Sequence, residues 1–285
     1  MQFIVKILDF LVASNVYVSL GVVSLTLLSL DIRYAEHPNL LCFVFFATLF
    51  TYNFIRLLNV HFIISTSNSL RHQLIYRYRR FFWLVCAISA VIGFYFFVPI
   101  SQFIFLPIIV LGSLSIIYGL PIYKNRFHLF RLRDVPGLKI FLIAFVWSYV
   151  TEGLPALING EPLYYLALIE RFLFIFAITI PFDIRDVNYD ASHLATIPQY
   201  FGVNTAKWMA LFAIFSSELI LFYRFFLYND FNLIGVIVIY ITYEFSFILI
   251  YKCHLYSNER YFTYGVEGMS ILMGALFYFS QRIFG

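Results

Sequence analysis

Long runs of apolar residues recur along the whole chain, and they constrain its fold more than any other feature. A helix needs about 20 consecutive apolar residues to cross a bilayer, and this sequence of 285 residues contains many such runs. Charged residues make up 12% of the chain, against about 25% in an average soluble domain. The sequence therefore predicts a polytopic membrane protein.

We expect nine transmembrane helices, so the predicted fold class is all-α and residues 1–285 form a single domain. The first apolar run is long enough to span the membrane, and no small-residue cleavage site follows it, so we do not expect a cleaved signal peptide. The expected spans are 10–30, 39–57, 81–99, 102–119, 138–157, 163–182, 206–227, 231–250 and 264–283.

Positive charge predicts the orientation of these spans. If the amino terminus lies with the connections around 58–80, 120–138, 183–206 and 251–263, that side holds fifteen of the 19 Lys and Arg residues, when Arg56, Lys139 and Lys207 beside these ranges are included. The other side keeps four: Arg33, Arg171, Arg224 and Arg282. Cytoplasmic loops carry such an excess of Lys and Arg. We therefore expect the amino terminus and these loops on the cytoplasmic side of a plasma or inner membrane, and the carboxyl terminus outside.

Three aspartates, Asp183, Asp186 and Asp190, follow the expected sixth span at spacings of three and four, which place them on one face of a helix. A charge at the bilayer centre costs about 2.5–3.5 kcal/mol, so the membrane boundary is the favourable place for them. Clustered carboxylates repel each other unless cations lie between them, and Mg²⁺ is typically held by one or two carboxylates plus substrate phosphates. The run therefore favours an Mg²⁺–diphosphate site, with an ordinary polar loop as the alternative.

The segment RDVNYDASHLATIPQYFG, residues 185–202, resembles the second aspartate-rich motif of the UbiA-type membrane prenyltransferases. That motif reads roughly N/D-x-R-D-x-x-x-D, then T-L/I-P/A and a downstream L/F-G. The residues that match it are Asp183, Arg185, Asp186, Asp190, Thr196, Ile197, Pro198, Phe201 and Gly202.

The resemblance implies an all-helical bundle of nine spans around a central cavity. It also implies transfer of a polyprenyl group from its diphosphate to an aromatic or other acceptor, with Mg²⁺ and release of diphosphate. Asp183, Asp186 and Asp190 would be the catalytic metal ligands.

A second segment, YGLPIYKNR at residues 118–126, resembles the family's Y-S-x-P-x-x-K-R segment. The resemblance implies that Lys124 and Arg126, together with Arg185, bind the diphosphate. A lysine point charge and an arginine fork both suit phosphate oxygens. The alternative is that the positive-inside bias alone places cations here.

The family's first motif, usually N-D-x-x-D-x-x-x-D, is degenerate in TYNFIRLLNVHF at residues 51–62. An echo between IRLLN at 55–59 and IRDVN at 184–188 aligns the three aspartates with Phe54, Leu57 and His61. A second register places the missing acids at Ile55 and Asn59. Neither register supplies a carboxylate, because residues 37–133 contain no Asp or Glu.

This loss limits the metal chemistry, because two facing carboxylate clusters can hold two Mg²⁺ ions across one diphosphate. The polar residues left in the segment are candidates to contact phosphate oxygens directly: Asn53, Arg56, Asn59 and His61. Arg56 is the candidate to substitute for a cation.

Other polar residues inside the spans have simpler interpretations. Intramembrane acids usually face the bundle interior, so we expect Glu218, Glu244 and Glu267 to hydrogen-bond between helices, with an acceptor pocket as the alternative for the last two. Glu152 is expected at the outer interface. The cysteines show no metal-binding spacing and favour buried structural thiols; they are Cys42, Cys86 and Cys253.

The leading hypothesis is an Mg²⁺-dependent membrane prenyltransferase whose partners are a polyprenyl diphosphate, an acceptor and the lipid bilayer, not nucleic acid. The alternative is a non-catalytic descendant that binds an isoprenoid lipid, and the degenerate first motif supports it. A transporter is a third hypothesis, but the sequence lacks paired interrupted helices in matching positions. Nothing in the sequence indicates the acceptor, the prenyl chain length or the oligomeric state.

Overall fold

The computed structural model describes residues 10–33, 35–64, 78–119, 121–124, 129–131, 135, 137–187, 196–228, 231–255 and 257–284, without the side chains of 59–64, 119, 121–124 and 129–131. Contacts divide the chain into two compact units. Unit 1 contains residues up to Val23 and Pro38–Leu132, and unit 2 contains Ser24–His37 and residues from Arg133 onward.

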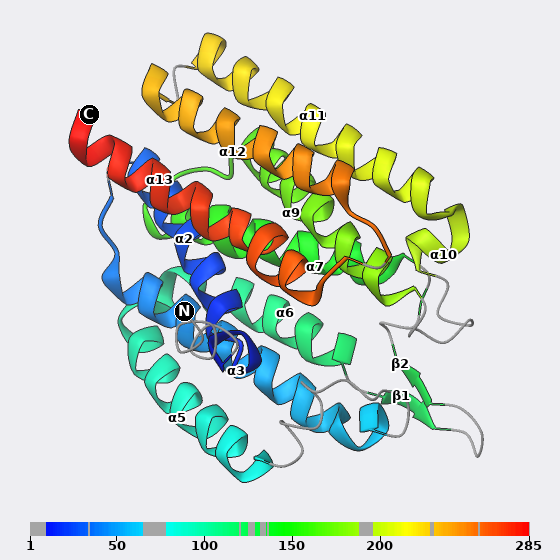
Figure 1. The fold of residues 1–285 in the computed structure, drawn as a ribbon. Helices are drawn as coiled ribbons and strands as arrows, with labels where there is room; N and C mark the ends of the chain where they lie inside the picture. The colour runs from blue at the N-terminus through cyan, green and yellow to red at the C-terminus, as the bar shows by residue number, and fades with distance from the viewer. Residues whose placement is uncertain are drawn as a thin grey trace. The chain divides into compact units, whose positions relative to one another are not determined.

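Unit 1 is built from apolar helices and one short hairpin (Figure 1). Helix α2, Val16–Ile32, begins in this unit and ends in unit 2. The other elements are α3 (Pro38–Ile64), α5 (Arg79–Phe97), η1 (Val98–Ile100), α6 (Ser101–Gly119), β1 (Pro121–Lys124) and β2 (Leu129–Arg131).

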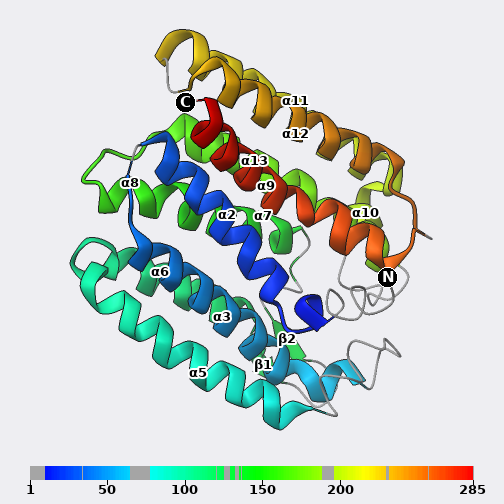
Figure 2. The same cartoon turned by 60° about the vertical axis from the view of Figure 1, so that its left-hand side comes forward.

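Helices α3 and α5 lie side by side in both views (Figures 1 and 2). Leu57, Phe82 and Cys86 form a buried cluster between them, against which Phe50 and Phe54 pack. At η1 the chain reverses direction, so the helical stretch Arg79–Tyr118 folds back on itself (Figure 2). This reversal matches the boundary expected between the third and fourth spans.

The long basic connection after α6 contains two strands that the sequence analysis did not predict. Strands β1 and β2 pair antiparallel, with Lys124 opposite Leu129. Their apolar and aromatic residues favour strand conformation, but the segment is too short for a periodic pattern to distinguish it from a loop.

The secondary-structure elements described in unit 2 are all helical. Its elements, after the end of α2, are α7 (Leu138–Ser148), the π-helical turn η3 (Tyr149–Gly153), α8 (Leu154–Ile158), α9 (Tyr165–Asp186), α10 (Ile197–Phe201), α11 (Val203–Tyr228), α12 (Leu233–Lys252), the π-helical turn η5 (Tyr261–Val266) and α13 (Gly268–Phe284).

Helix α9 is the central helix of unit 2 because it packs against α7, α11 and α12. Its middle section is buried almost all round, from Phe174 to Ile178, as expected for a helix without a solvated face. Helices α11 and α12 lie side by side in both views (Figures 1 and 2). Asn232 begins α12 by accepting a hydrogen bond from the Gly235 N–H at 2.7 Å.

Helix α13 approaches the middle of α2 closely at Gly274. A Cβ atom on Gly274 would lie 2.0 Å from the backbone oxygen of Ser24. The Ser24 hydroxyl donates a hydrogen bond to the Ile271 carbonyl at 2.9 Å. Small residues permit such backbone contact between membrane helices, so only glycine fits position 274.

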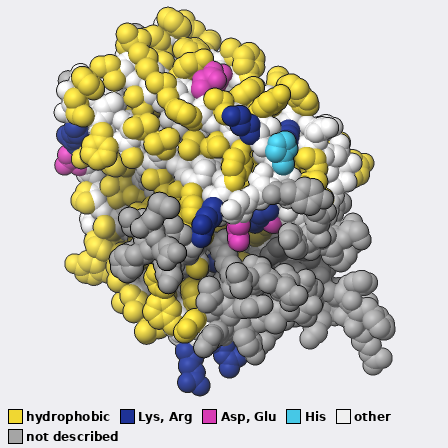
Figure 3. Space-filling model, viewed as in Figure 1, with side chains coloured by type: hydrophobic (Ala, Val, Ile, Leu, Met, Phe, Trp, Pro, Cys, Tyr) yellow, Lys and Arg dark blue, Asp and Glu magenta, His cyan; other side chains and the backbone are white. Residues whose placement is uncertain are grey.

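These features confirm an all-α integral membrane fold. Helices or helical turns occupy each of the nine ranges expected to span the membrane. On the face in Figure 3, the side chains of the described residues are largely hydrophobic. Six stretches of the described chain are long and apolar enough to cross a membrane: Pro38–Leu58, Arg79–Tyr118, Leu138–Ile158, Tyr165–Asp186, Val203–Tyr228 and Leu233–Lys252. The count of nine spans and the single domain stay predictions.

Candidate functional site

The last turn of α9 carries two of the three predicted carboxylates. Asp183 is 1% exposed, and the side chain of Asp186, the final residue of the helix, is 26% exposed. A helix carboxyl end carries a partial negative charge and disfavours carboxylates. Both aspartates therefore require compensating cations.

Asp183 receives its cation from α7. The Lys139 Nζ lies 2.5 Å from the Asp183 Oδ1. Lys139 lies in the first turn of α7, which begins after Gly137 at φ 71°, a conformation that glycine adopts without steric cost. The amino end of a helix is electropositive and disfavours a lysine. Lys139 therefore compensates the carboxylate at the electronegative end of α9, and Asp183 compensates the lysine at the electropositive end of α7.

Asp186 is paired within its own helix. The Arg185 Nε and Nη2 donate to its two carboxylate oxygens at 2.7 and 2.9 Å. The guanidinium carbon also lies 5.3 Å from the ring centre of Phe182 and 5.8 Å from that of Phe262, distances typical of cation–π contacts. Arg185, predicted to bind diphosphate, thus pairs with Asp186 and lies against two aromatic rings.

Helix α10 holds the chain beyond this turn. The Gln199 side chain accepts a hydrogen bond from the Thr196 N–H at 3.0 Å and donates one to the Val187 carbonyl at 3.3 Å. The matched motif residues at 196–198 therefore pack back toward the end of α9. Asp190, the third predicted ligand, lies outside the described residues.

The donor chemistry at this helix end fits a magnesium ion bound together with a phosphate ligand. Carboxylate oxygens are the hard ligands that Mg²⁺ prefers, and one or two of them suffice when phosphates complete the shell. Among the described residues, no three His, Cys, Asp or Glu side chains are grouped so that they could hold a metal ion by themselves. The carboxylates of Asp183 and Asp186 are ligands of the type that Mg²⁺ prefers, and a phosphate ligand would supply the remaining oxygens.

The other predicted diphosphate ligands in the basic connection are only partly described. The backbone of Lys124 ends strand β1, but its side chain is not described. Arg126 lies outside the described residues.

Two predicted ligands from the degenerate motif, Asn53 and Arg56, form hydrogen bonds with the turn that precedes α2. Asn15 has a positive φ of 62°, where the amino-terminal helical turn ends before α2. The Asn53 amide accepts a hydrogen bond from the Asn15 side chain at 2.8 Å and donates to the carbonyls of Ser14 and Leu49, each at 2.9 Å. The Arg56 guanidinium donates to the Ala13 carbonyl at 3.1 Å.

Asn53 is 1% exposed, so its amide is committed to the protein backbone. Phe54 and Leu57 pack in the α3–α5 cluster. The side chains of Asn59 and His61 lie outside the part of the structure that is described. The roles assigned to Asn53, Arg56 and Asn59 stay predictions.

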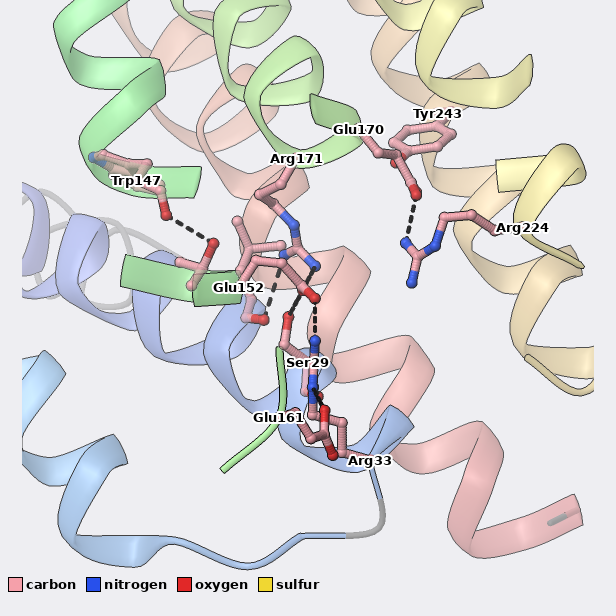
Figure 4. A network of polar contacts seen from close by, with 11 residues as sticks. Ser29, Arg33, Trp147, Glu152, Glu161, Glu170, Arg171, Arg224 and Tyr243 are labelled. Atoms are coloured by element: carbon pink, nitrogen blue, oxygen red, sulfur yellow. Dashed lines mark hydrogen bonds and ion pairs between the residues drawn. The ribbon is translucent and has the colours of Figure 1, made fainter. Parts of the chain in front are cut away.

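A buried charge network, which the sequence analysis missed, lies in unit 2 (Figure 4). Its first half centres on Glu152 in η3, which is buried inside the protein at 4% exposure. The expected position of Glu152 at the outer interface of the membrane stays a prediction. Glu152 pairs with Arg33 at 2.5 Å and Arg171 at 3.8 Å, and accepts a hydrogen bond from Ser29. Burial alone would lower the pKa of Arg33, but Glu152 and Glu161 raise it above its ordinary value.

The second half of the network joins α9 to α11 and α12. The Arg224 Nη1 lies 2.6 Å from the Glu170 Oε2, and the Tyr243 hydroxyl donates to the Glu170 Oε1 at 2.8 Å. The Arg224 guanidinium also lies 4.7 Å from the ring centre of Phe231. Three arginines balance three glutamates, so the network brings no net charge into the bundle.

Comparison with known proteins is informative only at the level of structure. No protein-family profile and no curated protein matches the sequence. Solved structures do match: the apo structure of a UbiA homolog from Aeropyrum pernix K1 is 13% identical, covers 94% of this chain and 98% of its own, and has a TM-score of 0.68.

This chain has the UbiA fold. A UbiA homolog from Archaeoglobus fulgidus bound to GPP and Mg²⁺ is 15% identical over 92% of this chain and 98% of its own, with a TM-score of 0.65. The same homolog bound to DMAPP and Mg²⁺ has a TM-score of 0.66 and covers 95% of this chain and 96% of its own. The predicted UbiA-like fold is confirmed, although the identities are too low to carry activity across.

Proposed function

We propose that this protein is a membrane prenyltransferase that uses Mg²⁺ and transfers a polyprenyl group from its diphosphate to an aromatic or other acceptor. The observation that carries the proposal is the pairing of two helix ends in a chain with the UbiA fold. The last turn of α9 presents Asp183 and Asp186, and the first turn of α7 presents Lys139 beside them.

The two helix ends suit the two parts of a metal–diphosphate ligand. The electronegative end of α9 and its carboxylates favour a divalent cation, and the electropositive end of α7 and its lysine favour phosphate oxygens. Asp183, Asp186 and Asp190 would hold the ion, and Lys124, Arg126 and Arg185 would bind the diphosphate. A bound Mg²⁺ would neutralise the charge that develops on the leaving diphosphate.

Support for this assignment also comes from what the similar structures are described as binding. One UbiA homolog was solved with GPP and Mg²⁺ and also with DMAPP and Mg²⁺. We propose the same ligand class for this chain. We further propose a plasma or inner membrane location, with the amino terminus and the motif loops cytoplasmic and the carboxyl terminus outside.

The alternative function is binding of an isoprenoid lipid without catalysis. It is favoured by one observation, the lack of any Asp or Glu in residues 37–133. The hydrogen bonds between Asn53 or Arg56 and the turn before α2 agree with this alternative, because they engage the Asn53 amide and part of the Arg56 guanidinium.

The two functions are separated by measuring binding and diphosphate release on the purified full-length protein. We expect Asp186→Asn to weaken Mg²⁺-dependent binding of geranyl diphosphate by about a hundredfold, which corresponds to about 2.8 kcal/mol. Glu244→Gln, an acid in α12 that accepts a hydrogen bond from Tyr240, is the control and should bind like wild type.

Release of diphosphate by the wild type in the presence of an acceptor would support transfer. Binding that loses its Mg²⁺ dependence in Asp186→Asn, with no release from wild type, would support the lipid-binding alternative. Wild-type affinity in Asp186→Asn would contradict the proposed site.

A further inference from the structure

The ion pair between Lys139 and Asp183 places a positive side chain on a carboxylate that the proposed function assigns to the metal. Asp183 is nearly inaccessible, with 2% of its side chain exposed, whereas 23% of the Lys139 side chain is exposed. The two residues are 44 positions apart and come from different helices. Lys139 is therefore not part of the aspartate motif, and nothing in the motif pattern assigns it.

Lys139 and Arg185 differ in how firmly they are held on their carboxylates. Arg185 forms two hydrogen bonds with Asp186 and contacts two aromatic rings. Lys139 reaches Asp183 through a flexible four-carbon side chain and contacts one of its carboxylate oxygens, Oδ1. An ammonium is a compact, rotatable point charge, so Lys139 is the cation that a competing ion can displace.

The two helix ends favour the divalent ion over the lysine ammonium as the partner of Asp183. At the carboxyl end of α9 any cation is stabilised by the helix dipole, and this favours the ion with the larger charge. At the amino end of α7 the lysine is itself unfavourable until it meets an anion. The diphosphate oxygens supply such an anion when the ion takes Asp183.

We infer that Lys139 competes with the divalent cation for Asp183 and thereby sets the metal concentration at which the site binds its prenyl diphosphate. This inference rests on the proposed function, because it requires Asp183 to be a metal ligand. Since residues 37–133 provide no carboxylate, few acidic ligands are available, and the state of Asp183 then has a large influence on metal loading.

The test is a metal titration that does not depend on turnover. Mn²⁺ binding to the full-length protein is measured by electron paramagnetic resonance with saturating geranyl thiolodiphosphate, which resists cleavage. We expect Lys139→Met to bind Mn²⁺ about tenfold more tightly than wild type, equivalent to about 1.4 kcal/mol. Lys139→Gln, which keeps a hydrogen-bond donor, should shift the affinity in the same direction and serves if the Met variant does not fold.

Lys207→Met is the matched control, because Lys207 lies in unit 2 and contacts the Tyr251 carbonyl at 3.4 Å. It removes one positive charge and should leave Mn²⁺ affinity unchanged. Adding Asp183→Asn to Lys139→Met should abolish the gain. Mn²⁺ should also raise the melting temperature of Lys139→Met more than that of wild type, because a ligand stabilises the state that binds it.

The outcomes separate the inference from the proposed function. If wild type binds Mn²⁺ with the analogue but both Lys139 variants bind it equally or more weakly, the competition is refuted and the site remains. If neither wild type nor any variant binds Mn²⁺ with the analogue, the proposed function fails, and the inference fails with it.

Discussion

The ion pair between Arg224 and Glu170 permits a quantitative test of the buried network. The two side chains are each 6% exposed and lie 2.6 Å apart. Arg224→Met removes the guanidinium but keeps a chain of similar length against the rings of Tyr164 and Phe231. Glu170 would then retain the Tyr243 hydroxyl without its charged partner.

Removing one partner of a buried ion pair costs about 3–5 kcal/mol, because the remaining charge is left without compensation. Loss of a desolvated cation–π contact adds up to about 2 kcal/mol. By contrast, Arg282 and Glu36 lie 3.7 Å apart with side chains 57% and 86% exposed. Breaking such an exposed pair costs about 0–1 kcal/mol, so Arg282→Met is the matched control.

Thermal unfolding of the purified protein in detergent measures the difference. At about 2–4 °C per kcal/mol for a chain of this size class, Arg224→Met should lower the melting temperature by on the order of 10 °C. The double variant Glu170→Gln with Arg224→Met should be less destabilised than the sum of the single changes, because it leaves no buried charge. A shift in Arg224→Met no larger than that in Arg282→Met would refute the structural role.

Three further outcomes are expected. Gly274→Ala should destabilise the protein by about 3 kcal/mol or more in the same melting assay, because its Cβ would overlap the Ser24 carbonyl. The control Gly112→Ala should be tolerated, because no atom lies within 4 Å of its Cβ. Burial raises the pKa of the Cys253 thiol from 9.0 to about 11, so at pH 8 iodoacetamide should modify it about a hundredfold more slowly than an ordinary thiol, with the rate rising up to about pH 11. Asn53→Ala should lower stability by about 1–3 kcal/mol while leaving geranyl diphosphate affinity unchanged, because its amide is bound to backbone carbonyls; a lower affinity with normal stability would instead make it a substrate ligand.

The fold was largely predictable because hydrophobic length is a strong signal in a membrane chain. Each expected span is occupied by helix, and the sixth ends at Asp186, where the aspartate pattern placed the membrane boundary. The hairpin of β1 and β2 was not predictable, since four residues such as Pro121–Lys124 carry no decisive periodicity.

The partners of the site residues were not predictable from spacing. The sequence separation of Lys139 and Asp183 does not indicate that they are in contact, because their contact depends on how α7 packs against α9. Lys139 was therefore counted only as one of the cytoplasmic charges. A lysine two residues after a glycine, at the electropositive start of a helix, is the only local signal that it needed an anion.

The buried network was missed for a similar reason. Counting positive charges on the two membrane sides assigns Arg171 and Arg224 to the outer side, because the count treats each residue separately. Intramembrane charges are costly and generally pair within the bundle, so Glu170 beside Arg171 in an otherwise apolar span was the available signal. Its partners come from α11 and α12, however, and no sequence pattern connects those positions.

Exposure separates the two groups of charges that α9 carries. Glu170 and Asp183 are 13 residues apart in sequence, which corresponds to about 20 Å along a helix. The buried apolar stretch from Phe174 to Ile178 lies between them. Around Glu170 both partners of the ion pair are 6% exposed, so exchanging a cation there would require opening the bundle. At the other end, the Lys139 and Asp186 side chains are 23% and 26% exposed. Lys139 is therefore more open to solvent than Arg224, although its partner Asp183 is 2% exposed. The same helix therefore has one set of charges suited to stabilising the bundle and a second set suited to exchanging ligands.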